Sequence, residues 1–233
     1  MSARVGIYGG TFNPIHLGHL RAAEEVAERL ELERVVFVPS GQPPHKHSDD
    51  AADPIAPAAE RLAWVRSAIA CNTRFELSML EVERAGPSYL VDTLEALGRE
   101  LALGRDRLLF ILGRDAFQEM GGWREPRRLL TLANFAVTTR PPVQTGSLRE
   151  WLPECVREDV ELEPDGLAAN HRNAGTRIEL VGITALDVSA TDLRARVRAG
   201  RSLRYLVPEV VRESIEKSNA YASRGTMQTS ARQ

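Results

Sequence analysis

The chain has 233 residues, and its 30 Lys+Arg and 32 Asp+Glu residues give a formal net charge of −2. This balance leaves no basic excess for a dedicated nucleic-acid binder, and no apolar run approaches the roughly 18 residues that a membrane span needs. Two cysteines, Cys71 and Cys155, are too few for a disulfide framework. Because no leader-peptide pattern precedes the first apolar segment, we expect a cytoplasmic protein without nucleic-acid or membrane partners.

Short apolar runs alternate with helical patterns along the chain, which is the order that βαβ units require. This order predicts an α/β fold with a doubly wound, mainly parallel, Rossmann-like sheet and a helical C-terminal end. We expect strands at 4–8, 34–39, 74–80, 107–112, 134–139 and 177–183, and helices at 16–30, 58–70, 89–101, 190–198 and 208–218.

The chain shows no internal repeat and no clean linker, so we expect a single domain over residues 1–217. The segment 141–176 is rich in Pro, Glu, Arg and Asn, and we interpret it as a surface excursion. Residues 218–233 lack apolar periodicity, which predicts a disordered tail.

The segment after the first expected strand, GGTFNPIHLGH (9–19), has the composition of a phosphate site. Gly9 and Gly10 let the backbone approach a ligand, and a helix N-terminus follows. His16 and His19 lie on one face of the first helical turn, where their rings can donate hydrogen bonds to phosphate oxygens. No lysine follows the glycines, so a Walker A mechanism is disfavoured. Two capping histidines, or a metal pair that lacks a third ligand, are the alternatives.

A second candidate anion site is VSATDLR (188–194), near the C-terminal end. Ser189 is a good N-cap residue with Asp192 three positions later, so a simple capped helix explains the pattern by itself. The hydroxyls of Ser189 and Thr191, together with the guanidinium of Arg194, would also suit a phosphate at a helix N-terminus.

Together, the two segments resemble the T/HxGH and ISSTxxR signatures of the nucleotidylyltransferase α/β-phosphodiesterase superfamily. The resemblance implies that the first motif binds the triphosphate, with His16 and His19 as catalytic residues, and that the second holds the β- and γ-phosphates. The ATP-binding residues that it implies are Gly9, Gly10, Thr11, Phe12, His16, His19, Gly113, Asp115, Ser189, Thr191 and Arg194.

Segments in the middle and at the end of the chain resemble bacterial nicotinate-nucleotide adenylyltransferases. They are GQPPHK (41–46), PSYLVDTL (87–94), FILGRD (110–115) with the following Trp123, and GRSLRYLVPE (200–209). Leu90 departs from the threonine that is usual in this family. The residues that the resemblance assigns to nicotinate mononucleotide are Asn13, Lys46, Ser88, Tyr89, Leu90, Asp115, Trp123 and Arg124.

Several of these residues also have structural explanations. Lys46 would otherwise be a solvated loop lysine, and Trp123 a half-buried residue that packs on a helix. His45 and His47 flank Lys46 and could suggest a metal, an interpretation that we disfavour because no further ligand is evident.

The activity that the resemblance implies is transfer of AMP from ATP to nicotinate mononucleotide, giving deamido-NAD and pyrophosphate. Mg²⁺ would arrive with ATP, without a dedicated metal site on the protein. The alternatives are a nicotinamide-mononucleotide or dual-specificity enzyme, a sister enzyme such as phosphopantetheine adenylyltransferase or a cytidylyltransferase, and a non-catalytic nucleotide-binding module. The sequence leaves a homo-oligomer open.

Overall fold

The structure is a computed structural model that describes residues 4–44, 55–139, 146–184 and 186–222. Its strands are β1 (Val5–Gly10), β2 (Arg34–Pro39), β3 (Phe75–Leu77), β4 (Leu108–Gly113), β5 (Asn134–Thr139), β6 (Val160–Leu162), β7 (Ala168–His171) and β8 (Arg177–Gly182). Its α-helices are α1 (Leu17–Arg29), α2 (Ala58–Ile69), α3 (Leu80–Glu83), α4 (Leu90–Glu100), α5 (Arg114–Glu119), α6 (Pro126–Leu132), α7 (Leu148–Trp151), α8 (Ala190–Arg198) and α9 (Glu209–Ser218). Two 3₁₀ helices, η1 (Met120–Gly122) and η2 (Glu154–Asp159), complete the set.

The eight strands form one sheet in the order β3-β2-β1-β4-β5-β8-β7-β6. The strands from β3 to β8 in this order pair in parallel, whereas β7 pairs with both β8 and β6 in an antiparallel manner. The expected doubly wound, mainly parallel α/β sheet is therefore confirmed. The chain reverses its direction of winding between β1 and β4, which is the place where open α/β sheets bind ligands.

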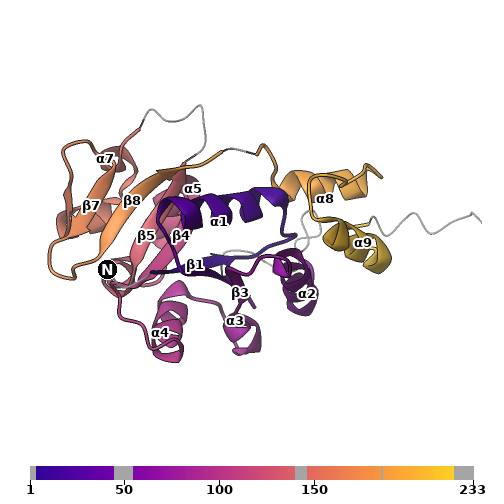
Figure 1. The fold of residues 1–233 in the computed structure, drawn as a ribbon, viewed down its shortest axis with the longest axis horizontal. Helices are drawn as coiled ribbons and strands as arrows, with labels where there is room; N and C mark the ends of the chain where they lie inside the picture. The colour runs from indigo at the N-terminus through magenta and orange to yellow at the C-terminus, as the bar shows by residue number, and fades with distance from the viewer. Residues whose placement is uncertain (1–3, 45–54, 140–145, 185, 223–233) are drawn as a thin grey trace, which may run out of the picture.

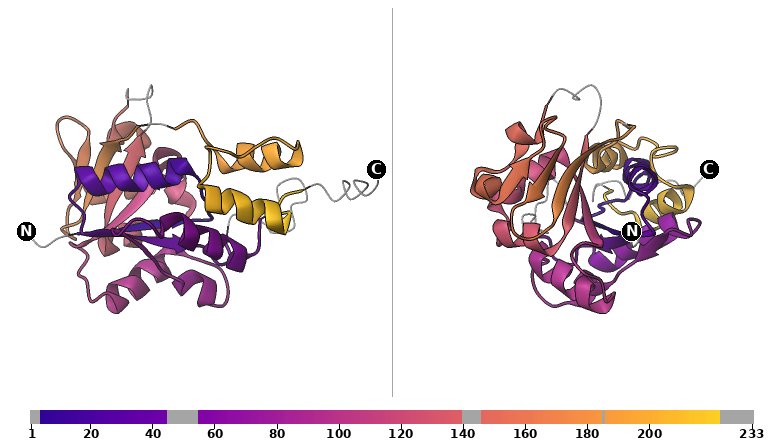
Figure 2. Two further views of the ribbon diagram at one scale, coloured as in Figure 1. Left: turned by 45° about the vertical axis from the view of Figure 1, so that its right-hand side comes forward. Right: turned by 60° about the vertical axis from the view of Figure 1, so that its left-hand side comes forward.

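Helices cover both faces of the sheet, with α1 on one face and α4 on the other (Figure 1). The side chains of β2 alternate accordingly: Val35 and Phe37 belong to the hydrophobic cluster on the α1 face, and Val36 and Val38 belong to the cluster on the α4 face. Such a strand is apolar throughout because both of its faces are buried. Helices α8 and α9 lie beyond one end of the sheet, and α9 lies beside α2 (Figure 2).

The segment expected to be a surface excursion is instead part of the sheet and the core over its described residues, 146–176. It contributes β6 and β7 as an antiparallel extension of the sheet. Leu148, Trp151 and Val156 are buried in the cluster on the α4 face. The prediction of a surface excursion was therefore wrong. The many polar residues of this segment concealed the apolar residues between them, which are buried in the core.

The C-terminal segment also departs from expectation. Helix α9 ends at Ser218 as predicted, but the chain then continues in a defined path as far as Ala222. Tyr221 is only 8% exposed, and its ring packs against Trp64 of α2. The prediction of disorder from residue 218 is therefore wrong for 219–222, and residues 223–233 lie outside the described part of the chain.

None of the helices in the described ranges is long and apolar enough to cross a membrane. Cys71 and Cys155 are both exposed and are not joined in a disulfide.

The buried role of the 146–176 segment predicts that Leu148→Ala lowers the free energy of unfolding by about 2–5 kcal/mol, because the side chain is fully buried and leaves a cavity. Urea unfolding followed by circular dichroism measures this change. The matched control is Arg149→Ala in the same helix, where the side chain is exposed and the change should stay within about 0.5 kcal/mol. Equal, small effects of both substitutions would contradict the placement of α7 in the core.

Candidate active site

A cavity of about 410 Å³ opens at the carboxyl ends of β1 and β4, at the point where the sheet winding reverses. Gly9 and Gly10 end β1 on one side of it, and Gly113 ends β4 on the other. Phe110 and Leu112 supply an apolar floor between them. The fold therefore places a cavity where a nucleotide-binding α/β protein carries its ligand.

Many of the residues predicted from the sequence meet in this cavity. Those that line it are Gly9, Gly10, Thr11, Phe12, His19, Ser88, Tyr89, Leu90, Gly113, Trp123 and Arg124. Lining residues that the sequence interpretation missed are Tyr8, Ser40, Pro43, Pro44, Glu81, Phe110, Leu112, Ala116 and Glu119. Most of the missed residues are apolar, so their residue types gave no chemical signal, although Pro43, Pro44, Phe110 and Leu112 lie within the recognised segments 41–46 and 110–115.

The two histidines form a stacked pair at the start of α1. Their ring centroids lie 3.7 Å apart at an interplanar angle of 27°, and the backbone N–H of His16 donates to Nδ1 of His19 at 3.2 Å. A neutral imidazole that accepts at Nδ1 carries its proton on Nε2, which makes that nitrogen a donor. His16 is 3% exposed and is not among the residues that line the cavity, whereas His19 lines it. His19 is thus the histidine placed to contact a ligand directly.

Gly18 lies between the two histidines in the sequence, at a position with little room for a side chain. A Cβ atom at this position would lie 3.0 Å from Nδ1 of His16, a tight contact that requires the His16 ring to shift by a few tenths of an ångström. Phe12 is a second special position, with a φ of 46°, a conformation that costs a non-glycine residue on the order of 1 kcal/mol. Its buried ring packs edge-on against Tyr8 and His19, which holds the loop in this conformation.

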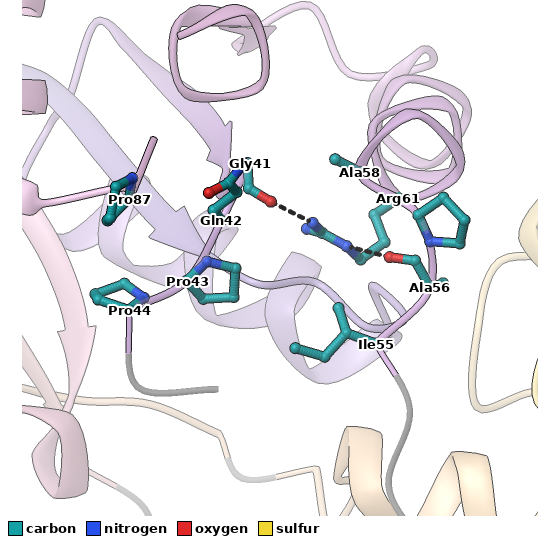
Figure 3. Close-up of a pocket in the computed structure, with 10 residues that line it drawn as sticks. Gly41, Gln42, Pro43, Pro44, Ile55, Ala56, Ala58, Arg61 and Pro87 are labelled. Atoms are coloured by element: carbon teal, nitrogen blue, oxygen red, sulfur yellow. Dashed lines mark hydrogen bonds between the residues drawn. The ribbon is translucent and has the colours of Figure 1, made fainter. Parts of the chain in front are cut away.

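Arg61 of α2 is a buried guanidinium that joins three loops around the cavity. It donates to the carbonyl oxygens of Thr11 at 2.7 Å, Ala56 at 2.9 Å and Gly41 at 3.1 Å. The side chain lies between Gly41 and Ala56 in Figure 3, at the back of a second cavity of about 500 Å³. Burial lowers the pKa of Arg61, and the nearby Tyr221 and Glu81 raise it. Arg61 is 1% exposed, and Nε and both terminal nitrogens of its guanidinium bind backbone carbonyls.

A buried carboxylate, Glu81, organises the opposite wall. The hydroxyl of Thr93 donates to Glu81 Oε1 at 2.6 Å, and the Ser88 side chain also hydrogen-bonds the carboxylate. Ser88 Oγ in turn accepts from the backbone N–H groups of Gly41 at 3.0 Å and Gln42 at 3.2 Å. Burial raises the pKa of Glu81, while these hydrogen bonds and two arginines lower it. Ser88, which was assigned to substrate, therefore uses its hydroxyl to fix the loop at Gly41.

Asn13 was assigned to nicotinate mononucleotide, but its side chain does not line the cavity. Its Oδ1 accepts from the backbone N–H of Ala56 at 3.0 Å and from the hydroxyl of Tyr221 at 2.5 Å, and the residue is buried. The assignment is corrected accordingly: the side chain of Asn13 ties the loop after β1 to the C-terminal segment and to the start of α2.

The VSATDLR segment begins helix α8 as predicted. Ser189 Oγ accepts from the backbone N–H of Asp192 at 3.1 Å, which confirms the cap. Arg194 is buried and donates to the carbonyl oxygen of Asn13 at 2.6 Å and to the hydroxyl of Thr191 at 3.1 Å. The structure thus brings α8 against the loop after β1, although Ser189, Thr191 and Arg194 do not line the cavity itself.

Asp115, another residue predicted from the sequence, stands outside the cavity lining. Asp115 lies in the first turn of α5, next to the lining residues Gly113 and Ala116, but its side chain is 82% exposed and pairs with Arg114 at 3.0 Å. Lys46 lies outside the described residues, as do His45 and His47. Trp123 follows η1 and is half-buried, with part of its ring packed on the core and part on the cavity.

The position of the cavity, the glycine loop and the histidine pair together define an α/β protein that binds a nucleotide at the carboxyl edge of its sheet. A sequence model of the family described as cytidylyltransferase-like matches residues 7–196. This match covers most of the chain, and the chain belongs to that family.

Relatives with similar sequences carry a more specific name. The chain is 42% identical over 224 residues to a protein of Desulfatibacillum aliphaticivorans named probable nicotinate-nucleotide adenylyltransferase, covering 94% of this chain and 99% of the relative. It is 41% identical over 220 residues to a protein of the same name from Syntrophotalea carbinolica, covering 94% of this chain and 98% of that relative.

The fold is shared with solved structures of lower sequence identity. The nicotinic acid mononucleotide adenylyltransferase of Plasmodium falciparum, complexed with NaAD, superposes with a TM-score of 0.68 at 15% identity, covering 94% of this chain and 97% of that protein. A second structure of the same enzyme, complexed with APC, gives a TM-score of 0.64 at 17% identity over the same shares.

The position of Arg61 predicts a large stability effect. Arg61→Met keeps an apolar stem but removes the donors to three carbonyls and one of the two arginine charges that act on the Glu81 carboxylate, so we expect the free energy of unfolding to fall by about 3 kcal/mol. Urea unfolding measures the loss. Arg66→Met, on an exposed position of the same helix, is the control and should change it by less than about 0.5 kcal/mol. A stability of Arg61→Met equal to that of the control would show that Arg61 does not hold the loops.

Proposed function

We propose that this protein transfers AMP from ATP to nicotinate mononucleotide, giving deamido-NAD and pyrophosphate, a reaction of NAD biosynthesis. The observation that carries the proposal is a single cavity lined at one end by the glycine loop and His19 and at the other by Tyr89, Leu90 and Trp123. Such a cavity can hold a triphosphate and a flat aromatic ring at once. The naming of relatives about 40% identical over most of this chain supports the same activity.

The reaction needs no nucleophile from the protein. A phosphate oxygen of the mononucleotide attacks the α-phosphorus of ATP in line, the new P–O–P bond of the dinucleotide forms, and the bond from the α-phosphorus to the β-phosphate oxygen breaks. The electron pair leaves with pyrophosphate. Because the attacking phosphate is already ionised near neutral pH, catalysis consists of positioning and charge stabilisation.

The histidines stabilise the negative charge that develops on the triphosphate while the bond to the α-phosphorus breaks. In this proposal Nε2–H of His19 donates to a phosphate oxygen, while His16, buried behind it, holds the ring in orientation through its backbone N–H and the ring stack. The backbone of Gly9, Gly10 and Thr11 receives the nucleotide on the same side of the cavity.

The leaving pyrophosphate is assigned to the start of α8. Ser189 and Thr191 are exposed there, and Arg194 lies directly beneath them. A helix N-terminus with hydroxyls and a guanidinium favours a polyanion. In this assignment Arg194 has two roles, because it also donates a hydrogen bond to the carbonyl oxygen of Asn13 in the loop after β1.

The acceptor is assigned to the other end of the cavity. Trp123 would stack on the cationic pyridinium ring, a contact worth on the order of 1–2 kcal/mol when desolvated. Asp115 is accessible beside Gly113, where it could accept hydrogen bonds from ribose hydroxyls. Lys46 would bind the acceptor phosphate, as a cation in a proline-rich loop.

We expect ATP to enter as its Mg²⁺ complex, since phosphate oxygens and water satisfy the octahedral preference of this ion. In the part of the chain that the structure describes, there is no group of three or more His, Cys, Asp or Glu side chains that could hold a metal.

Pyrophosphate release, measured with ATP and Mg²⁺ and one acceptor at a time, tests the proposal. We expect fast release with nicotinate mononucleotide and only background release with 4′-phosphopantetheine or without an acceptor. Release that depends on phosphopantetheine would assign the protein to a sister activity, and no release with any acceptor would contradict transferase function.

The role of His19 predicts that His19→Ala lowers kcat about 10²-fold, which is the scale for the loss of one donor to a developing anion. Steady-state pyrophosphate release at saturating ATP measures this. Glu28→Ala, on an exposed position of the same helix, is the control and should retain wild-type turnover. Turnover of His19→Ala close to that of the control would exclude His19 as a catalytic residue.

A further inference from the structure

Arg124 has a distinctive position in the cavity. Among the described residues that line it, Arg124 is the only arginine or lysine, and it lies at the end formed by Tyr89, Leu90 and Trp123. The acidic residues that line the cavity are Glu81, which is buried and hydrogen-bonded to Thr93, and Glu119, which is exposed. A mononucleotide ring stacked on Trp123 would therefore come close to a single cationic side chain.

The guanidinium of Arg124 is held in place by an aromatic ring. Its Cζ atom lies 4.7 Å from the ring centroid of Tyr89, the residue that precedes α4. Its Nε lies 3.7 Å from a carboxylate oxygen of Glu125, a long contact between two partly exposed side chains. The side chain is 52% exposed, and its ionic contact among the described residues is this long one with Glu125. Stacking on Tyr89 restricts the position of the guanidinium and leaves its positive charge intact.

The two pyridine mononucleotides differ in one group, a carboxylate in the nicotinate form and a carboxamide in the nicotinamide form. Both rings carry the positive charge of an N-substituted pyridinium. A nearby guanidinium attracts the carboxylate, whereas with the carboxamide it faces an uncompensated positive ring. The same residue thus favours one substrate and disfavours the other, which is an effective way to obtain specificity.

Leu90 brings no polar or charged side chain to this end of the cavity. It is the first residue of α4 and lines the cavity, and its side chain has no hydrogen-bonding group. The first-turn N–H groups of α4 add a weaker positive potential. The side chains of Tyr89 and Trp123 offer one hydroxyl and one indole N–H, which bind an amide as readily as an acid.

We infer that Arg124 is the residue that selects a pyridine carboxylate over the carboxamide, taking the place of a hydroxyl contact that Leu90 cannot provide. This inference rests on the proposed function, since it concerns the acceptor of that reaction. Its effect falls on acceptor binding, because the guanidinium is placed against the ring and not against the reacting phosphates.

The experiment measures kcat/KM for nicotinate and nicotinamide mononucleotides with ATP and Mg²⁺, in wild type, Arg124→Gln and Arg124→Lys. We expect the ratio of the two kcat/KM values to fall about tenfold in Arg124→Gln, a modest factor because the site is half exposed to solvent. The loss should appear in KM for the nicotinate form, with kcat nearly unchanged. Arg124→Lys should keep most of the ratio, because it keeps the charge.

The control is Arg99→Gln, which removes the same charge from an exposed position in the last turn of α4, at the end opposite Leu90. It should leave the ratio at the wild-type value. In addition, Arg124→Gln combined with Leu90→Thr should recover part of the preference, because a hydroxyl then replaces the missing partner.

The outcomes separate this inference from the proposed function. If wild type uses nicotinate mononucleotide and Arg124→Gln keeps the ratio within twofold, the inference is wrong and the proposed function stands. If wild type neither turns over nicotinate mononucleotide nor binds it in calorimetry, both are wrong.

Discussion

The site depends on how the short loop after β1 is held. Two buried arginines from different helices donate to its backbone: Arg61 of α2 to the carbonyl of Thr11, and Arg194 of α8 to the carbonyl of Asn13. Charge-assisted hydrogen bonds of this kind are stronger than neutral ones, and a buried carbonyl that lost its donor would carry a desolvation cost. The loop can therefore keep the left-handed conformation of Phe12, which brings the ring of Phe12 against His19.

The same bonds connect parts of the site that are distant in the sequence. Arg61 also donates to Gly41, whose N–H is bound by Ser88, and the Ser88 hydroxyl contacts the buried Glu81. Gly41 itself packs so closely that a Cβ atom there would lie 2.2 Å from the carbonyl oxygen of Glu81. One buried polar network thus joins the loop after β1 to the cavity wall that contains Ser88 and Glu81. A reaction without a protein nucleophile requires such positioning above all.

Much of the fold follows from the sequence, because a strand buried on both faces appears as a short apolar run. The run 134–139 matches β5 at both ends, and 190–198 matches α8. The strands β6 and β7 were missed because they have only three and four residues and lie among polar ones. Residues from several motifs meet at one cavity, yet the motifs did not separate residues that face it from residues that hold it. Asn13 and Ser88 support the loops, and Arg61 gave no signal because a lone arginine within a helical pattern is ordinarily exposed.

The central claim is that one cavity receives both the nucleotide and the pyridine ring, and a crystal structure of the protein with bound deamido-NAD tests it most directly. The account predicts that the dinucleotide spans the carboxyl ends of β1 and β4. Its phosphates should lie against the glycine loop and His19, and its pyridine ring should stack on Trp123 with the carboxylate facing Arg124. A pyridine ring bound elsewhere, away from Tyr89, Leu90 and Trp123, would contradict the account.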